Sequence, residues 1–349
     1  MVKIGIVGLP NAGKSTLFNA LVSKYKAAVA SHPFTTIDKN VGVVEVPDET
    51  LFKLAKIENI AKVTPATITF IDIAGLIKGA HQGEGLGNQF LHHIREVDLI
   101  LHVVRFFKSE DVPHIHPKID PKEDVEIVNE ELLLADLQTL EKKLTKEKTT
   151  TEERSFIQKF IRQLNRGKFA AEVEVDDKEK ELVKSLNLLT SKRQLLVANI
   201  GEEEIKNPPK TLDGKPLLTI CAKLEADLEE LPWVEAQQFL KAYGLEKSAK
   251  ERIILEAYKS LDLVTFYTIA KRRQARAWSL KKNSTALEAA GKIHTDFSKY
   301  FVKVEAIAAE QLIKIGSWSK AKELGKIGLH GRDYIVEDGD VLEFKIAMK

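Results

Sequence analysis

The sequence predicts an α/β protein in which a mostly parallel sheet is interrupted by a helical hairpin insertion and followed by a small β-grasp-like domain. Three observations support this prediction. Strand-like apolar runs alternate with helical segments as far as about residue 104. Apolar residues then recur at helical spacing between about residues 125 and 190, and short strand-like runs close the chain after residue 276. Strands that alternate with helices are typical of largely parallel sheets.

The first part of the parallel sheet is predicted from four runs. The predicted strands are 3–7, 39–46, 66–73 and 99–104. A helix opens at Thr16, directly after a glycine-containing loop, and a second helix begins at 47 and runs to about 59. The runs are short and mostly apolar, as expected for buried strands of a sheet that helices cover.

The sequence pattern in the middle of the chain predicts helices and no convincing strand. Leucines at 133, 137, 140 and 144 share one helical face, and 157, 161 and 164 share another. Thr149 to Glu153 resembles a turn followed by a helix start. We therefore expect two long helices folded as an antiparallel hairpin, with a shorter helix near 182–189 and the apolar stripes forming the hairpin core.

The sheet is predicted to resume with strands at 194–199 and 216–221, followed by helices from 224 to about 260. The last part of the chain predicts a small mixed sheet with one helix at 285–290, closed by Gly291. Its strands are expected at 276–280, 302–307, 333–336 and 341–346. The run Glu337-Asp338-Gly339-Asp340 is a hairpin-turn signal.

Composition excludes several classes of protein. The chain has 349 residues, which favours two or three domains. No apolar run approaches membrane-spanning length and the N-terminus opens into a core strand, so we expect a cytoplasmic protein with no membrane partner. The single cysteine, Cys221, excludes an internal disulfide and a cysteine-based metal cluster. The formal net charge of +2 means that a nucleic-acid partner would need a local basic patch.

The run from Gly8 to Thr16 fits a phosphate-binding loop of the P-loop NTPase fold. Two glycines separated by four residues are followed by Lys14 and Ser15, between a strand and a helix. The loop backbone and helix start at Asn11, Ala12, Gly13 and Thr16 should surround the phosphates, with the partial positive charge of the helix N-terminus behind them. Lys14 should reach the β and γ phosphates, and the Ser15 hydroxyl should bind Mg²⁺.

A second motif follows the strand at 66–73. Asp72 should contact Mg²⁺ through water, and Gly75 should lie beside the γ phosphate as part of a switch. A switch threonine is also expected on the metal. Thr36 is preferred for this role, although the adjacent Thr35 is an alternative. The glycine-rich run 79–87 is expected to act as a second switch segment.

These motifs together resemble the YchF family, the Obg-related ATPases of the translation-factor-like P-loop class. The resemblance rests on the runs 8–16, 72–80, 83–91, 199–202, 275–278, 291–297 and 333–336. It implies an ATP-binding core, a helical hairpin insertion, a C-terminal TGS domain and association with ribosomes and their RNA. The expected domains are a nucleotide-binding domain at 1–124 and 193–275, the helical insertion at 125–192 and the TGS-like β-grasp domain at 276–349.

The usual water-positioning glutamine is absent after Gly75, where the chain has Leu76. An alkyl chain cannot hydrogen-bond water, so we expect slow hydrolysis by the chain alone. The resemblance implies that His114 positions the water, with His81 and Gln82 in the glycine-rich run as the alternatives. Asn11 either helps to hold K⁺ near the phosphates, as in some relatives, or only tolerates the turn geometry.

The base site is expected at Asn199, Ile200 and Glu202, together with Cys221 and Ala222. Most relatives carry Asn-Lys-x-Asp where this chain has Asn-Ile-Gly-Glu. Guanine's two N–H donors fit the shorter Asp, whereas the longer Glu202 side chain is poorly suited to accept both. The sequence therefore predicts ATP rather than GTP as the nucleotide.

Basic residues cluster near the start of the last domain. Lys271, Arg272, Arg273 and Arg276 are expected to contact RNA, and the helical hairpin carries a second basic set interspersed with acids. The leading hypothesis is a slowly hydrolysing ATP switch that acts on ribosomes. The alternatives are a nucleotide-gated protein-interaction module with negligible hydrolysis, and a GTPase.

Overall fold

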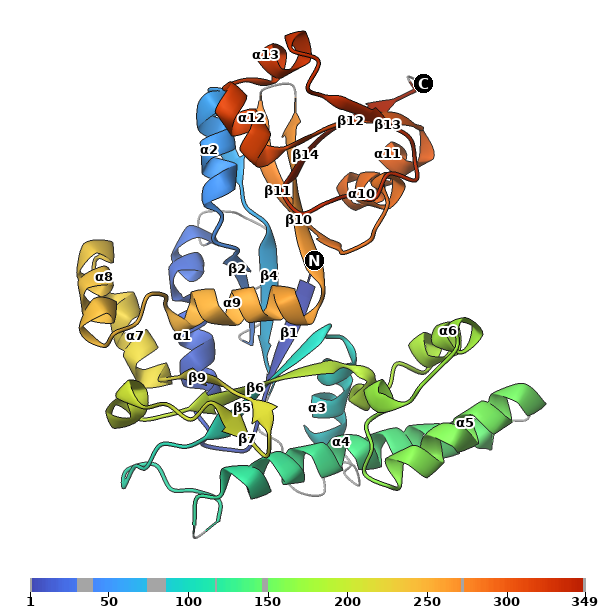
Figure 1. Ribbon diagram of the computed structural model, residues 1–349. Coiled ribbons are helices and arrows are strands. Elements are labelled where there is room, and N and C mark those ends of the chain that lie inside the picture. The colour runs from blue at the N-terminus through green and yellow to red at the C-terminus, as the bar shows by residue number, and fades with distance from the viewer. Residues whose placement is uncertain are drawn as a thin grey trace. The chain divides into compact units, whose positions relative to one another are not determined.

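The computed structural model describes residues 2–29, 40–73, 86–116, 118–145, 150–270 and 273–347 (Figure 1). The chain divides into two compact units. The larger unit comprises 2–44 and 69–253, and the smaller unit comprises 45–68 and 254–349. Within the described ranges, no helix is both long and apolar enough to cross a membrane.

A mostly parallel sheet of six strands forms the centre of the larger unit. Its order is β2-β4-β1-β5-β6-β9, and β1 with β5, β5 with β6, and β6 with β9 are all parallel pairs. The strands are β1 Val2–Val7, β2 Val41–Glu45, β4 Thr67–Asp72, β5 Leu99–Arg105, β6 Arg193–Asn199 and β9 Leu218–Ile220. All seven residues of β5 are buried, as expected for a central strand covered on both faces. The predicted α/β fold is confirmed.

Helices follow most strands of this sheet. Outside the insertion they are α1 Lys14–Val29, α3 Leu86–Arg95, α7 Ala222–Glu230, α8 Trp233–Ala242 and α9 Ala249–Ser260, the last of which crosses the boundary between the units. The 3-10 turns are η2 Ala170–Glu172, η3 Leu189–Ser191 and η4 Glu202–Lys206, and a small ribbon pairs β7 Thr211–Leu212 with β8 Lys215–Pro216. Helix α1 begins at Lys14, so the phosphate-loop motif leads directly into a helix N-terminus.

The insertion is a helical hairpin, as its leucine spacing predicts. Helix α4 spans Pro121–Leu144 and α5 spans Thr151–Leu164, and the two lie side by side in Figure 1. Thr150 and Glu153 form a reciprocal capping box that satisfies two backbone donors and fixes the start of α5. Helix α6, Asp177–Leu186, completes the cluster. The predicted stripes form its core, in which Leu140, Phe160 and Leu164 are buried.

Asp136 ties the insertion to the chain that re-enters the sheet. This side chain on α4 is completely buried, and its carboxylate accepts hydrogen bonds from the Leu189 and Thr190 amides and the Thr190 hydroxyl at 2.7–2.9 Å. Burial raises the pKa of the Asp136 carboxyl, and these three donors oppose that rise. This side chain of α4 therefore binds the short turn that precedes β6.

Replacing Asp136 with Ala is expected to lower the opening free energy of the Leu189 and Thr190 amides by about 3 kcal/mol, because two buried amides lose their acceptor. Native-state hydrogen exchange measures this directly. Glu141→Ala, an exposed position on the same helix, is the matched control and should stay within about 0.5 kcal/mol of the wild type. Equal protection in both variants would mean that Asp136 is dispensable.

A second six-stranded sheet forms the smaller unit. Its order is β13-β12-β14-β10-β11-β3, with β10–β14 and β11–β3 parallel and β10–β11, β12–β13 and β12–β14 antiparallel. The strands are β3 Lys62–Thr64, β10 Leu263–Ala270, β11 Gln274–Lys281, β12 Phe301–Ala308, β13 Gly328–His330 and β14 Asp340–Ile346. The helices are α2 Glu49–Ile57, α10 Ala286–Ile293, α11 Thr295–Lys299, α12 Ala309–Ile315 and α13 Trp318–Glu323.

This unit differs from the sequence expectations in several respects. It takes in 254–275, which were expected in the nucleotide-binding domain, because β10 forms a hairpin with β11. Residues 333–336 form only an isolated bridge from Ile335 to Thr285 rather than a strand. Gly291 lies inside α10 and does not end it. The expected single helix of this unit is accompanied by α11, α12 and α13, which the local patterns did not predict. It is also accompanied by α2, the helix predicted at 47–59, because 45–68 belong to this unit and not to the nucleotide-binding domain where they were expected.

Candidate nucleotide-binding site

The phosphate loop adopts the backbone geometry that its glycines predict. Gly13 has a φ of 92°, and Asn11 is left-handed with a φ of 62°. A Cβ at Gly8 would lie 2.3 Å from the Val103 carbonyl oxygen of β5, and one at Gly13 would lie 2.2 Å from the Asn199 amide nitrogen. Both glycines are thus required by close neighbours as well as by the turn.

Lys14 points back into the loop. Its side chain is buried, and the ammonium Nζ donates a 2.8 Å hydrogen bond to the Leu9 carbonyl. Burial lowers the pKa of Lys14 to about 8, and the negative charge of Asp72 opposes this effect. A cation without a nearby carboxylate hydrogen bond, surrounded by loop backbone, is ready to pair with an incoming anion.

Ser15 and Asp72 meet beside this lysine. The Ser15 hydroxyl donates to Asp72 Oδ2 at 2.8 Å, although the two residues come from α1 and from the end of β4. The other carboxylate oxygen, Oδ1, is buried and has no hydrogen-bond partner within the described part of the chain. A hydroxyl beside a carboxylate with an unused oxygen fits a hard divalent cation. Thr36 and Gly75, also predicted for this site, lie outside the described residues.

Asn199 clamps the phosphate loop to the loop after β9. Its side-chain nitrogen donates to the Ala12 carbonyl at 2.9 Å, and its side-chain oxygen accepts from the Ala222 amide at 3.0 Å. The residue is buried at the carboxyl end of β6. The structure therefore brings Asn199, Ala12 and Ala222 together, and it uses the Asn199 amide group for protein contacts.

Glu202 lies in η4, and its carboxylate already has two partners. It contacts the Lys223 ammonium at 3.1 Å and accepts from the Tyr243 hydroxyl at 3.3 Å, with 39% of its side chain exposed. Ile200 is buried, and its amide donates to the Ile220 carbonyl. Ile200 and Cys221 line a cavity of about 60 Å³.

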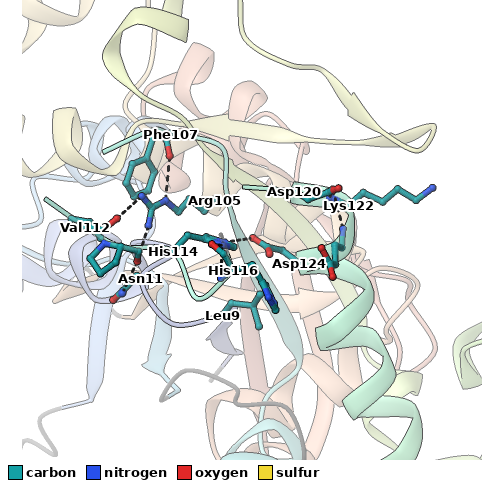
Figure 2. A network of polar contacts seen from close by, with 12 residues as sticks. Leu9, Asn11, Arg105, Phe107, Val112, His114, His116, Asp120, Lys122 and Asp124 are labelled. Atoms are coloured by element: carbon teal, nitrogen blue, oxygen red, sulfur yellow. Dashed lines mark hydrogen bonds and ion pairs between the residues drawn. The ribbon is translucent and has the colours of Figure 1, made fainter. Parts of the chain in front are cut away.

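His114 lies on the loop after β5, and both of its ring nitrogens have partners (Figure 2). The His116 amide donates to Nδ1 at 3.1 Å, and Nε2 lies 3.1 Å from the Asp124 carboxylate. Only 6% of the His114 side chain is exposed. The other two water-positioning candidates, His81 and Gln82, lie outside the described residues.

Arg105 and Asn11 hold the loop that carries His114. The guanidinium of Arg105, at the end of β5, donates to the Phe107, Val112 and Pro113 carbonyls, and its carbon lies 4.4 Å from the Phe107 ring centre. The Asn11 side-chain nitrogen also donates to the Pro113 carbonyl, at 3.0 Å. Figure 2 shows Arg105 beside Phe107 and Val112, with Asn11 close to Val112. The phosphate loop is thus linked directly to the His114 loop.

The basic patch predicted in the smaller unit is described only in part. Lys271 and Arg272 lie outside the described residues, while Arg273 and Arg276 are exposed. The Arg276 guanidinium carbon lies 3.9 Å from the Trp278 ring centre, on the same face of β11. An exposed cation stacked on an aromatic ring is a common element of RNA-binding surfaces.

Comparison with known proteins decides the family. A family model described as 50S ribosome-binding GTPase matches residues 3–149, and the model YchF-GTPase_C, described as a protein of unknown function, matches residues 263–347. The ribosome-binding ATPase YchF of Bacillus subtilis is 43% identical, with 98% of each chain covered. The chain belongs to the YchF family. The resemblance inferred from the motifs is confirmed.

Other YchF proteins agree over the full length. The ribosome-binding ATPases YchF of Escherichia coli O157:H7 and Mycoplasma genitalium are 41% and 42% identical, and the alignments cover 98% and 99% of this chain and of theirs. A solved structure of the Schizosaccharomyces pombe YchF GTPase is 32% identical, has a TM-score of 0.85, and covers 99% of this chain and 97% of its own. The predicted P-loop fold is confirmed.

Two residues of the candidate nucleotide-binding site in this YchF protein were not predicted from the sequence. Arg105 ends a buried strand, next to the phosphate-loop strand, in which His102 is the only other polar residue, and a charge at that place could have indicated a function. Asp124 gave no signal, because an acid in the first turn of a helix is ordinary. Its meeting with His114 depends on how the loop folds back onto α4.

Proposed function

We propose that this YchF-family chain is a Mg²⁺-dependent, ATP-binding and slowly ATP-hydrolysing switch that associates with ribosomes in the cytoplasm. The observation that carries the proposal is the assembled phosphate site, in which Lys14, Ser15 and Asp72 lie together at the start of α1. The bacterial relatives that match over the full length are named ribosome-binding ATPases. A phosphate site with these parts is what nucleotide-dependent switches require.

The oxygen atoms at the site support the assignment of Mg²⁺ and K⁺. Ser15 and Asp72 would hold Mg²⁺, and the unpartnered Oδ1 of Asp72 supports this assignment. Thr36 is proposed as the switch ligand, and Gly75 as a neighbour of the γ phosphate. Asn11 would offer its side-chain oxygen to K⁺, because its side-chain nitrogen is used by Pro113. Bound Mg²⁺ would neutralise charge on the phosphates.

ATP is proposed as the nucleotide, rather than GTP, because the Glu202 carboxylate already contacts two other side chains. Guanine recognition needs a carboxylate that accepts from two adjacent N–H groups, whereas Glu202 is shared between Lys223 and Tyr243. Guanine donors left without acceptors lower affinity by orders of magnitude. Among the relatives, the bacterial names state ATPase and the fission yeast name states GTPase. The remaining base contacts are assigned to the backbone near Ile200, Cys221 and Ala222.

Hydrolysis is proposed to be slow because Leu76 cannot orient water, and His114 is assigned that task. His114 lies on the loop that Asn11 links to the phosphate loop. This link supports the assignment, because a water-positioning group has to respond to the bound phosphates. The basic residues proposed to contact ribosomal RNA are Lys271, Arg272, Arg273 and Arg276.

Single-turnover ATP hydrolysis with and without purified ribosomes tests the switch against the alternative of a gated interaction module. We expect ribosomes to raise the rate at least roughly tenfold, the gain that about 1.4 kcal/mol of transition-state stabilisation gives. Replacing Arg273 and Arg276 with Ala should weaken this stimulation, and the difference from the wild type should shrink as salt rises, because fewer phosphate contacts flatten the salt dependence. Exposed Lys292→Ala on α10 is the control. Ribosome binding without any stimulation would favour the interaction module.

A further inference from the structure

Both ring nitrogens of His114 are held by neighbours. Nδ1 lies 3.1 Å from the His116 amide nitrogen and 3.3 Å from the His116 carbonyl oxygen, and Nε2 lies 3.1 Å from Asp124, whose ionised carboxylate can only accept, so Nε2 is the donor in that contact. Both side chains are nearly buried, at 6% and 4% exposed. The ring therefore has no nitrogen left with which to hold a water molecule.

The backbone that carries the ring is anchored as well. Arg105 and Asn11 both donate to the Pro113 carbonyl, which belongs to the residue directly before His114. Arg105 is fully buried, so this anchor is shielded from water. The backbone of His114 can consequently stay beside the phosphate loop while the ring itself changes partners. Only the contact with Asp124 has to break for Nε2 to become available.

We propose that Asp124 is a positioning residue for the hydrolysis reaction, which holds the Nε2–H of His114 in a resting orientation and must release it before His114 can hold the attacking water. This inference rests on the proposed function of His114. It assigns part of the slow intrinsic hydrolysis to a contact within the chain, in addition to the missing glutamine. A ligand or partner that separates Asp124 from His114 would accelerate the reaction.

The surroundings of Asp124 make this contact costly to break. Oδ1 of Asp124 is buried and has no hydrogen-bond partner in the described ranges, so the carboxylate depends on the hydrogen bond from His114 to Oδ2. Burial raises the pKa of Asp124, while the hydrogen bond from His114 opposes that rise. Release of His114 would leave both oxygens of a buried carboxylate unpaired, which favours the resting arrangement and slows hydrolysis.

The test compares single-turnover ATP hydrolysis in wild type, Asp124→Ala and Asp124→Asn. Removing the acceptor is expected to raise the rate about tenfold in Asp124→Ala, since the cost of release disappears. Asp124→Asn keeps a neutral acceptor and should give a smaller rise. Glu123→Gln removes an exposed acid from the same first turn of α4 and should leave the rate unchanged.

The double variant His114→Ala/Asp124→Ala shows whether the effect passes through His114. We expect it to hydrolyse ATP as slowly as His114→Ala alone. The Nε2–H proton of His114, protected by Asp124, should give a resolved NMR signal in wild type and lose it in Asp124→Ala. A rate that falls or stays unchanged in Asp124→Ala, with His114→Ala still slow, overturns this inference and leaves the proposed function standing. Normal hydrolysis by His114→Ala overturns the proposed role of His114 itself.

Discussion

Replacing Lys14 with Ala is expected to weaken ATP binding by at least roughly 100-fold, because a charge-assisted hydrogen bond to phosphate is lost from a site shielded from water. The ammonium of Lys14 is buried and donates only to the Leu9 carbonyl among its described contacts. Phosphate would replace that weak acceptor with full negative charges. Isothermal titration with ATP and Mg²⁺ measures the loss.

Two further variants make the Lys14 result interpretable. Lys14→Met retains the apolar stem, which separates the loss of charge from loss of packing in the loop. Lys210→Ala removes an exposed lysine from the same unit and should leave affinity unchanged. Wild-type ATP affinity in both Lys14 variants would contradict the assignment of the phosphate site.

His114→Ala is expected to lower single-turnover hydrolysis in the presence of ribosomes by roughly 100-fold, the lower end of the range for a positioned proton-transfer or water-orienting group. ATP affinity should change by less than about threefold, because the group acts in the transition state. The control is His92→Ala, whose side chain on α3 is 70% exposed. If His114→Ala and His92→Ala hydrolyse ATP equally fast, His114 has only a structural role.

Local patterns predicted those parts of the structure that depend on neighbours in the chain. The phosphate loop is one, because Gly8 and Gly13 determine its turn and α1 follows at Lys14. The start of α5 is another, since Thr150 and Glu153 cap the helix within one turn. The leucine stripes of the hairpin were also sufficient, because a buried helical face repeats along the sequence.

Features that depend on distant contacts were not predicted. β10 alternates in sequence like its partner, but its membership in the second sheet follows from pairing with β11 and β14. Residues 333–336 have strand-like composition, yet only Ile335 forms a bridge, so they add no strand to that sheet. Likewise, Asp124 gains its role only where the loop after β5 returns to α4.

Base recognition could be predicted from the sequence only in part. The replacement of Asp by Glu at 202 is visible in sequence and predicts a changed base. The hydrogen bonds from the Asn199 side chain to Ala12 and Ala222 could not be predicted from the sequence, because they join three segments that are far apart in the chain. The Asn199 amide group is therefore left out of the proposed base contacts, which we assign to backbone groups.

Competition of unlabelled ATP and GTP for one bound fluorescent nucleotide tests the central claim most directly. We expect ATP to displace the probe at concentrations at least roughly tenfold lower than GTP, since unpaired guanine donors cost about 1–3 kcal/mol. Glu202→Ala should leave ATP affinity nearly unchanged, and Glu202→Asp should narrow the gap by improving GTP binding. Equal or tighter binding of GTP by the wild type, lost in Glu202→Ala, would contradict the claim and identify the chain as a GTPase.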